Sequence, residues 1–196
     1  MTSHPFQPFD TRSPLELEER LRLVPKDALV KGLFLQRIAD EAKKLSGKPI
    51  REAKYVPFKD YPFTEWMQLI VDGGLAAYPR VPPREALRRL GHGTFATYRE
   101  STLGKVVLSV AGNSIGATIP LVPKLYALTS ARGTRVVIAH NEPGHCVVEM
   151  HDAWDFPDSY HVGVLEGGFL ALGHTVDVRV GTITRSRCDI EFRYAR

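Results

Sequence analysis

The stretch SYHVGVLEGGFLALGHTVDVRV, residues 159–180, holds four glycines, the first three of them within a run of apolar residues that recur at helical spacing. A dinucleotide-binding loop requires a strand, then the pattern G-x-G-x-x-G, then a helix. Here Gly163 and Gly167 are four residues apart and Gly168 follows directly, which places the glycines along one helix face. Each glycine costs about 1 kcal/mol against alanine inside a helix. We therefore expect this face to pack tightly on the sheet or a neighbouring helix, with a ligand lying against bare backbone as the alternative.

The segments flanking this helix alternate between apolar and polar residues with period two, which predicts four short strands. Residues 134–151, TRVVIAHNEPGHCVVEMH, predict a hairpin that turns at 141–144 and pairs His140 with His145. The core face of that hairpin would then hold Val137, Ala139, Cys146, Val148 and Met150. Residues 175–183 and 187–196 predict the last two strands, so this half of the chain is expected to be ββαββ.

The preceding half of the chain has helical periodicity. Ser13, Pro14 and Glu16 have the layout of a capping box, which predicts that a helix begins there. The expected helices cover residues 13–23, 33–47, 63–78, 81–91, 95–112 and 117–130, with a short strand at 28–32. In particular, the helix that begins at the prolines of 82–83 is expected to end near Gly91.

Helices first and strands later are typical of an α+β domain. We therefore predict N-terminal helices packed against a C-terminal four-stranded antiparallel sheet (ββαββ). The 196 residues fit one domain, 13–196, after a flexible N-terminal arm at 1–12.

Composition narrows the function classes. The net charge is +4, but basic residues are scattered and do not alternate with aromatics, so nucleic-acid binding is not indicated. No apolar run is long enough for a membrane span, and the N-terminus lacks the features of a signal peptide, so a cytoplasmic location is expected. Two cysteines are too few for a disulfide framework.

Candidate catalytic and metal-binding groups do not converge in the sequence. His140, His145, Cys146 and His151 lie on one predicted hairpin, but Cys146 points to the opposite face, and His151 is about 20 Å along the strand from His145. A zinc site needs three or four converging ligands, so no metal is predicted. His92, between two glycines at an expected helix end, could be an axial ligand or a general base, although such a histidine more commonly contacts the last helical carbonyls. No nucleophile elbow or phosphate-binding loop is present, so an enzyme is not expected.

Aromatic residues offer a different possibility. Trp66, Trp154, Tyr160 and the loop YVPFKDYPF at 55–63 are suited to a hydrophobic core, where large aromatics dominate burial. Together with a helix of low bulk, they could also line an apolar pocket between the helices and the sheet.

Four segments carry a resemblance to known proteins. The chain resembles a large paralogous family of myxobacterial proteins of unassigned function in LVKGLFLQ (29–36), YVPFKDYPFTEWMQLIV (55–71), REALRRLGHGTFATYRESTLGKV (84–106) and AWDFPDSYHVGVLEGGFLALG (153–173). Its layout is also similar to the superfamily of haem-dependent nitric-oxide sensors and vinyl-reductase-type small-molecule-binding domains. In these, helices pack against an antiparallel sheet and a Y-x-x-G-x-L-x-G helix precedes the last strands, as Tyr160, Gly163, Leu165 and Gly167 do here.

The resemblance implies a small-molecule sensor, and the departures from it bear on the cofactor. The haem sensors have a proximal histidine on a pocket helix and a tyrosine–serine–arginine trio for the haem propionates. That trio has no counterpart here, because Arg185, Ser186 and Arg187 fall in an expected hairpin turn and His92 lacks a ligand context. Haem is therefore disfavoured as a cofactor.

We expect a non-enzymatic, cytoplasmic regulatory or sensory domain that binds a small apolar or amphipathic ligand between helices and sheet. The expected ligand-binding residues are Trp66, His92, Tyr98, Tyr160, Gly163 and Gly167. One alternative is a homodimeric protein-interaction module without a small ligand, using the aromatic loop or the hairpin edge. The other is a haem-binding sensor.

Overall fold

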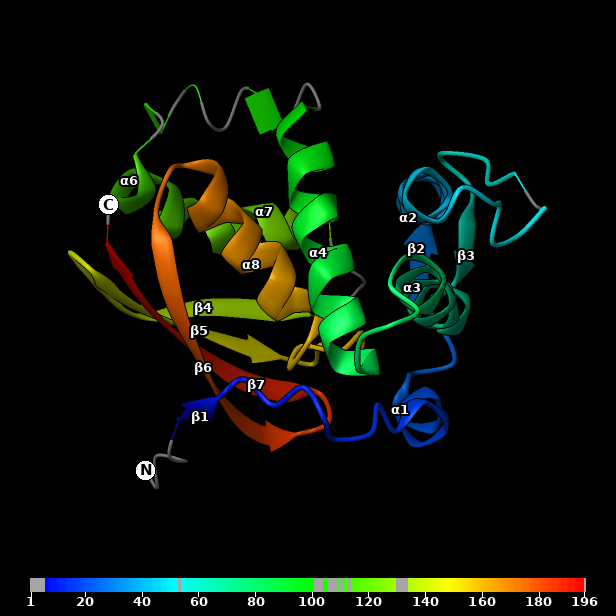
Figure 1. Ribbon diagram of the computed structural model, residues 1–196, viewed down its shortest axis with the longest axis horizontal. Helices are drawn as coiled ribbons and strands as arrows, with labels where there is room; N and C mark the ends of the chain where they lie inside the picture. Colours follow the sequence, from blue (N-terminus) through cyan, green and yellow to red (C-terminus); the bar gives the residue numbers. More distant parts are fainter. Residues whose placement is uncertain are drawn as a thin grey trace.

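The structure is a computed structural model that describes residues 6–52, 54–100, 104–105, 109, 111–112, 114–129 and 134–195, without the side chains of 97, 98, 128, 129, 182 and 183. Two lobes are seen in Figure 1, with helix α4 (Pro83–Glu100) between them. One lobe holds α1 (Leu17–Leu23), α2 (Gly32–Ser46), α3 (Phe63–Ala77) and a small antiparallel pair, β2 (Leu29–Lys31) and β3 (Asp60–Pro62). No helix of the described residues is long and apolar enough to cross a membrane.

The second lobe is an antiparallel sheet covered by helices, which confirms the α+β class. Its strand order is β1-β6-β7-β5-β4. The four expected strands are β4 (Arg135–Glu142), β5 (His145–His151), β6 (Thr175–Thr184) and β7 (Arg187–Ala195). A fifth strand, β1 (Gln7–Pro8), comes from the N-terminal segment and pairs with β6. Two residues are too few to produce an alternating pattern, so this strand was not predicted.

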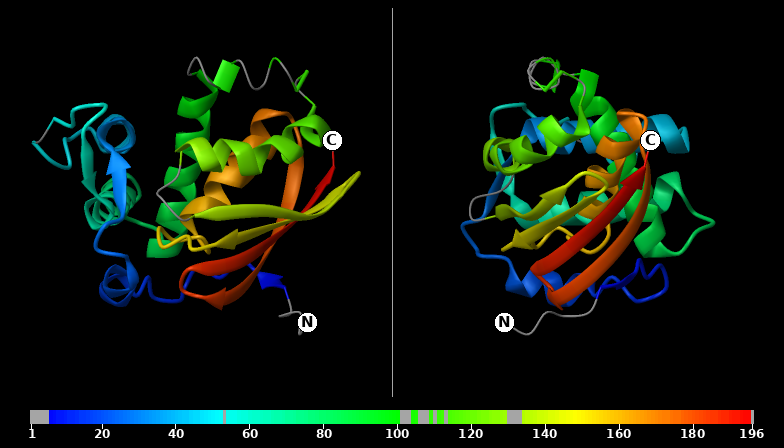
Figure 2. Two further views of the ribbon diagram at one scale, coloured as in Figure 1. Left: turned by 180° about the vertical axis from the view of Figure 1, so that it is seen from behind. Right: turned by 90° about the vertical axis from the view of Figure 1, so that its left-hand side faces the viewer.

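Helix α8 (Tyr160–Ala171) lies across one face of this sheet, beside the short α6 (Ile115–Thr118), a 3₁₀ turn η1 (Ile119–Leu121) and α7 (Val122–Thr129), as Figures 1 and 2 show. The predicted ββαββ order is therefore confirmed. Nearly every residue of α8 is buried, because the sheet covers one of its faces and α4 another. A helix buried on all sides needs no polar face, which explains why its apolar residues are not confined to one stripe.

The expected capping box is wrong. Helix α1 begins at Leu17, and its N-cap residue is Glu16, which has φ 52° and no capping hydrogen bond from its side chain. Ser13 instead donates its hydroxyl proton to the carboxylate of Asp10, and Asp10 also accepts from the backbone N–H of Arg12. The Ser13 hydroxyl is therefore hydrogen-bonded to Asp10 and does not cap the N-terminus of the helix, as the prediction had it. The boundary between an arm at 1–12 and the domain stays a prediction, and residues 1–5 lie outside the described part of the chain.

The predicted helix end at Gly91 is also wrong, because α4 continues through Gly91, His92 and Gly93 to Glu100. The reason is a close approach to α8. A methyl group at Gly91 would overlap the carbonyl oxygen of Tyr160, and it would lie 2.8 Å from the backbone nitrogen of Val164. Gly91 therefore serves helix–helix contact and not helix termination.

The hairpin β4–β5 has a different register from the one predicted. Its turn is the two residues Pro143 and Gly144, with Gly144 at φ 85°, so Glu142 pairs with His145 and His140 with Val147. A bulge follows between Ile138 and His140. The core face of β4 accordingly holds Val136 and Ile138 instead of Val137 and Ala139, since a shift of one residue exchanges the two faces of a strand. The predicted core positions of β5 (Cys146, Val148 and Met150) are confirmed.

Candidate functional site

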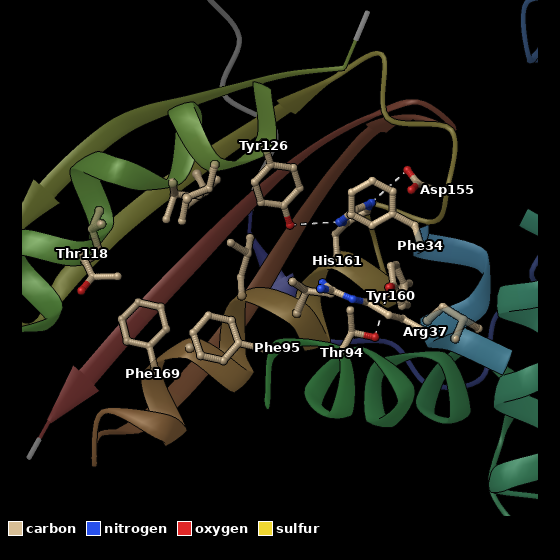
Figure 3. A pocket seen from close by; sticks show the side chains of 18 of the residues that line it. Phe34, Arg37, Thr94, Phe95, Thr118, Tyr126, Asp155, Tyr160, His161 and Phe169 are labelled. Carbon is tan, nitrogen blue, oxygen red and sulfur yellow. Dashed lines mark hydrogen bonds and ion pairs between the residues drawn. The ribbon is translucent and has the colours of Figure 1, made fainter. Parts of the chain in front are cut away.

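A cavity of about 170 Å³ lies between the helical lobe and the sheet lobe. Its walls are mostly apolar and come from β2, α2, α3, α4, α6, η1, α7, β5, α8 and β7. Part of this lining is drawn in Figure 3. The aromatic rings along it are Phe34, Phe63, Phe95, Phe169 and Phe192, joined by the polar aromatics Trp66, Tyr126 and Tyr160. An apolar cavity of ~150 Å³ is known to hold a benzene molecule. The space here therefore suits a ligand of about that size.

The cavity exists because the two hydrophobic cores do not merge. One core joins α1–α4 with Phe156 and Tyr160, and the other joins the sheet with α7 and α8. The residues at the boundary belong to both lobes, as in the edge-to-face contact of Trp66 from α3 with Tyr160 from α8 at 6.0 Å between ring centroids. Rings of this size on rigid elements leave space where their edges do not meet.

A polar cluster borders one part of the cavity. Asp155, in the connection before α8, accepts a hydrogen bond from the indole N–H of Trp66 at 2.9 Å. Its other oxygen lies 2.9 Å from Nε2 of His161. On the far side of the imidazole ring, Nδ1 of His161 is hydrogen-bonded to the hydroxyl of Tyr126 at 3.0 Å. The contacts of His161 with Tyr126 and with Asp155 are drawn with dashed lines in Figure 3. Together with the bond from Trp66, they join α3, α7 and α8.

The protonation of the cluster follows from burial and from its contacts. Burial opposes the charge of Asp155, but the nearby His161 and the hydrogen bonds from His161 and Trp66 outweigh it, so the pKa of Asp155 is lowered. Burial raises the pKa of the Tyr126 hydroxyl well above its usual value, and the negative Asp155 adds to the rise. Burial likewise raises the pKa of Tyr160, whose hydroxyl donates to Thr94 Oγ1 at 3.2 Å. The cluster therefore presents a carboxylate and two neutral phenols at neutral pH.

The cysteine along the cavity is not a reactive nucleophile. Cys146 is fully buried on β5, and burial raises the pKa of its thiol to about 12. A thiol is nucleophilic only as the thiolate, which this environment disfavours. Cys146 therefore acts as a small apolar side chain of the wall.

Helix α4 packs against the glycines of α8. The sequence predicted that the sheet or a neighbouring helix would approach them, and the neighbour is a helix. A methyl group at Gly163 would overlap the carbonyl oxygen of Arg88. At Gly167 it would lie 3.2 Å from Cα of His92 and 3.1 Å from Cβ of Phe95. A methyl group at Gly168 would lie 3.3 Å from the ring of Phe95, and Gly168 borders the cavity. Two of the three glycines thus serve helix packing, and the third reaches the cavity.

Charged residues close the outer side of the same helix pair. Glu166 of α8 accepts two hydrogen bonds of 2.6 Å from Arg88 of α4, and its Oε2 is 2.7 Å from Nε2 of His92. Burial opposes the charge of Glu166, but the contacts with His92 and Arg88 outweigh it and lower its pKa. His92 therefore binds a carboxylate on the α4–α8 pair and does not border the cavity.

Two of the six predicted ligand-binding residues, Trp66 and Tyr160, border the cavity. Gly163, Gly167 and His92 belong to the α4–α8 contact. The side chain of Tyr98 lies outside the part of the chain that the structure describes.

The residues that the sequence analysis missed are the polar ones. Asp155, His161 and Tyr126 are up to 35 positions apart in the chain, so spacing alone does not join them. One signal was available, because His161 is an ionisable residue in a helix that is otherwise almost wholly apolar, and such a residue needs a buried partner.

The histidines of the hairpin contact one another or carboxylates. No group of three or more potential metal ligands occurs among the described residues. The rings of His140 and His145 do lie close, at 4.5 Å between centroids, although the two residues are not paired in the strand register. Carboxylates are their neighbours: His145 contacts Glu191 at 2.9 Å, and His151 contacts Glu149 at 3.0 Å.

Comparison with protein families matches residues 22–194 to the family DUF2378, which is described as a protein of unknown function. No curated protein matches the sequence. The match covers most of the chain, including every element that lines the cavity.

Solved structures with a similar fold are H-NOX proteins. The unliganded Fe(II) H-NOX protein from K. algicida is 14% identical, with a TM-score of 0.57 over 85% of this chain and 97% of that one. The S. oneidensis H-NOX protein in the Fe(II)NO ligation state is 13% identical, with a TM-score of 0.57 over 85% of this chain and 100% of that one. A single-residue mutant of T. Tengcongensis H-NOX is 15% identical, with a TM-score of 0.57 over 92% of this chain and 93% of that one. At such identities the likeness shows the fold alone, and it confirms the predicted similarity to the haem-NO-binding layout.

Proposed function

We propose that this chain, which belongs to the DUF2378 family of proteins of unknown function, is a sensor domain that binds a small apolar molecule in the cavity between its lobes. The observation that carries the proposal is the cavity itself, about 170 Å³ of mostly apolar space at the boundary of two separate cores. A pocket with apolar walls and a few converging polar groups is the usual form of a small-molecule site. The similarity to H-NOX proteins supports a sensory role by fold analogy.

The position of the cavity gives a physical route from binding to signalling. The ligand would touch α2 and α3 of one lobe and α7, α8 and the sheet of the other. A ligand that contacts both lobes binds most tightly to the conformation in which both lobes touch it at once. Binding therefore shifts the population toward that conformation. The domain would therefore report its ligand as a change in how the lobes are held together.

A haem does not fit the residues of this cavity. Among the residues that the structure describes, His161 is the histidine that borders it. Its Nδ1 is hydrogen-bonded to Tyr126, and its Nε2 faces a carboxylate oxygen of Asp155 at 2.9 Å. Ligand pockets of ~300 Å³ or more are usual for drug-sized molecules, which are smaller than a porphyrin. We therefore expect haem titration of the purified protein to give no saturable Soret band, with His92→Ala behaving as the wild type.

Toluene is the probe that tests the proposal, since it matches the size and polarity of the cavity. We expect isothermal titration calorimetry to show saturable 1:1 binding, and the melting temperature to rise with toluene concentration. Val122→Phe on α7 places a ring at the cavity wall, so it should abolish binding. Ala127→Phe adds the same ring at an exposed site of the same helix and should leave binding unchanged. Equal loss of binding in both variants, or no binding by the folded wild type, would overturn the proposal.

An exposed aromatic favours the second function, a protein-interaction module. Phe58, in the loop between α2 and β3, is 86% exposed, and Val56 beside it is 57% exposed. Exposed apolar side chains in one loop are common at protein–protein contacts. Sedimentation at several concentrations tests this function: association that Phe58→Ser removes supports it, and a strict monomer contradicts it.

A further inference from the structure

Arg37 of α2 borders the apolar cavity. In Figure 3 its side chain extends from α2 toward the cavity, on the side of Thr94 and Tyr160. It is half-buried, and it makes no hydrogen bond, ion pair or ring contact with any residue in the described part of the chain. A guanidinium always carries its charge, so it needs an anion or water when it is partly removed from solvent.

The other arginines of the described residues that are buried or half-buried all have carboxylate partners. They are Arg20, Arg51, Arg84, Arg88, Arg179 and Arg185. Arg37 differs from them because no carboxylate of the described residues pairs with it, and because it borders the cavity. A cation that has no partner among the described residues, beside a mostly apolar space, marks a place where a ligand would supply the negative charge.

The acidic groups nearest to the cavity do not take this role. The carboxylate of Asp155 is engaged by His161 and Trp66. Glu41 also borders the cavity, one helical turn from Arg37, but the two form no ion pair within 4.0 Å. The Glu41 carboxylate is directed at α4, where its Oε1 would lie 2.7 Å from a methyl group at Gly93.

We propose that the ligand of this cavity is a small monocarboxylate with an apolar body, its carboxylate paired with Arg37 and its body among the aromatic rings. This inference rests on the proposed function and adds the chemical class of the ligand. The planar fork of arginine binds a carboxylate through two parallel hydrogen bonds. One guanidinium balances one negative charge, whereas a phosphate monoester carries nearly two at neutral pH and would leave charge uncompensated in apolar surroundings.

Benzoate and toluene are the two probes, because they share the ring and differ in the carboxylate. We expect wild-type protein to bind both at pH 7, as measured by isothermal titration calorimetry. Arg37→Gln should weaken benzoate binding roughly tenfold to hundredfold, the range for losing hydrogen bonds to a charged group, and should leave toluene affinity within about twofold. Arg37→Lys keeps the positive charge without the planar fork, so its benzoate affinity should lie between those of the wild type and Arg37→Gln.

Arg80→Gln is the matched control, since Arg80 is an exposed arginine away from the cavity. It removes the same charge and should leave the affinities for both probes unchanged. Equal melting temperatures of the variants without ligand would show that Arg37→Gln acts on binding and not on folding.

The outcomes separate this inference from the proposed function. If toluene binds and benzoate does not, or if Arg37→Gln binds benzoate as the wild type does, the carboxylate inference is overturned and the apolar cavity stands. If Arg37→Gln and Arg80→Gln weaken benzoate binding equally, the effect is one of net charge, and the inference is also overturned. If neither probe binds, the proposed function falls and the inference falls with it.

Discussion

The two sides of α8 differ sharply in how closely neighbouring elements approach. On the α4 side, Gly163 and Gly91 leave no room for a single methyl group against the opposing backbone. On the cavity side, aromatic residues from several elements surround about 170 Å³ of space. The glycines therefore mark where two backbones meet. The space for a ligand arises where bulky side chains of the two lobes do not meet.

The largest expected effect comes from adding one carbon on the tight side. Gly163→Ala forces a methyl group onto the carbonyl oxygen of Arg88, and a backbone atom in a buried helix cannot move aside easily. The alanine gains about 1 kcal/mol of helix propensity, but we expect a net loss of at least about 3 kcal/mol, at the upper end for an overpacked core. Chemical denaturation measures the change.

Gly168→Ala is the control for that substitution, because its methyl group would lie 3.3 Å from the side chain of Phe95, beside the cavity on the same helix. A side chain at a cavity wall can shift, so we expect a change within about 1 kcal/mol. Equal losses in the two alanine variants would break the comparison between the two sides of α8.

Removing the charged contacts on the α4 side of α8 should have the next largest effect on the free energy of unfolding. Glu166→Gln removes the negative partner of Arg88 and His92, and we expect the free energy of unfolding to fall by about 2 kcal/mol, the range for hydrogen bonds to charged groups. Glu85→Gln is its counterpart, because Glu85 also contacts Arg88 and Arg89 but lies nearer the surface. A loss below about 1 kcal/mol is expected there. A larger loss for Glu85→Gln would contradict the importance of the Glu166 contacts.

One carbon added on the cavity side of α8 should change the free energy of unfolding by less, and should raise it. Val164 follows Gly163 in the chain and borders the cavity. Val164→Ile adds a methylene to that wall, and we expect about 0.8 kcal/mol of stabilisation with weaker toluene binding. The melting temperature and calorimetry check the two parts. A destabilised Val164→Ile would show that the cavity wall is as tightly packed as the α4 contact.

The smallest expected effects are those of acid pH, which both sides share. The pKa values of Asp155 and Glu166 are lowered in the folded protein, so the unfolded chain binds these protons more readily. Unfolding then takes up protons below about pH 4, and stability is lost as the pH falls. Glu166→Gln and Asp155→Asn should each give a shallower fall in unfolding free energy between about pH 5 and pH 3. Slopes parallel to the wild type would assign the acid sensitivity to other carboxylates.

Sequence reasoning succeeded where a pattern has one physical cause. The glycines spaced along residues 159–172 required a close neighbour, and α4 is that neighbour. It failed where two causes share a residue type. Gly91 was interpreted as a helix end, although it serves the same helix contact as Gly163. The turn at Pro143–Gly144 is two residues shorter than the expected one, which alone would keep the faces of β4. The bulge between Ile138 and His140 adds a shift of one residue, and that shift exchanged the predicted faces.

The polar cluster could not be assembled from the sequence for a different reason. Trp66, Tyr126 and Asp155 lie on three separate segments, and only the tertiary arrangement of the lobes brings them to His161. The same holds for Arg37, whose lack of a partner within the described residues is visible only when the surroundings of every buried or half-buried arginine there are compared.

Trp66 gives the cavity an optical reporter. The chain has two tryptophans, and the other, Trp154, packs edge to face on Phe63 at 6.3 Å between ring centroids. Trp66 borders the cavity, and its indole N–H is held by the charged Asp155, so its emission depends on the field and the polarity of that space. A Trp154→Phe protein would carry a single tryptophan, at the ligand site. Its spectrum would report occupancy continuously and without a label, and the same signal would follow the exchange of one bound molecule for another in real time.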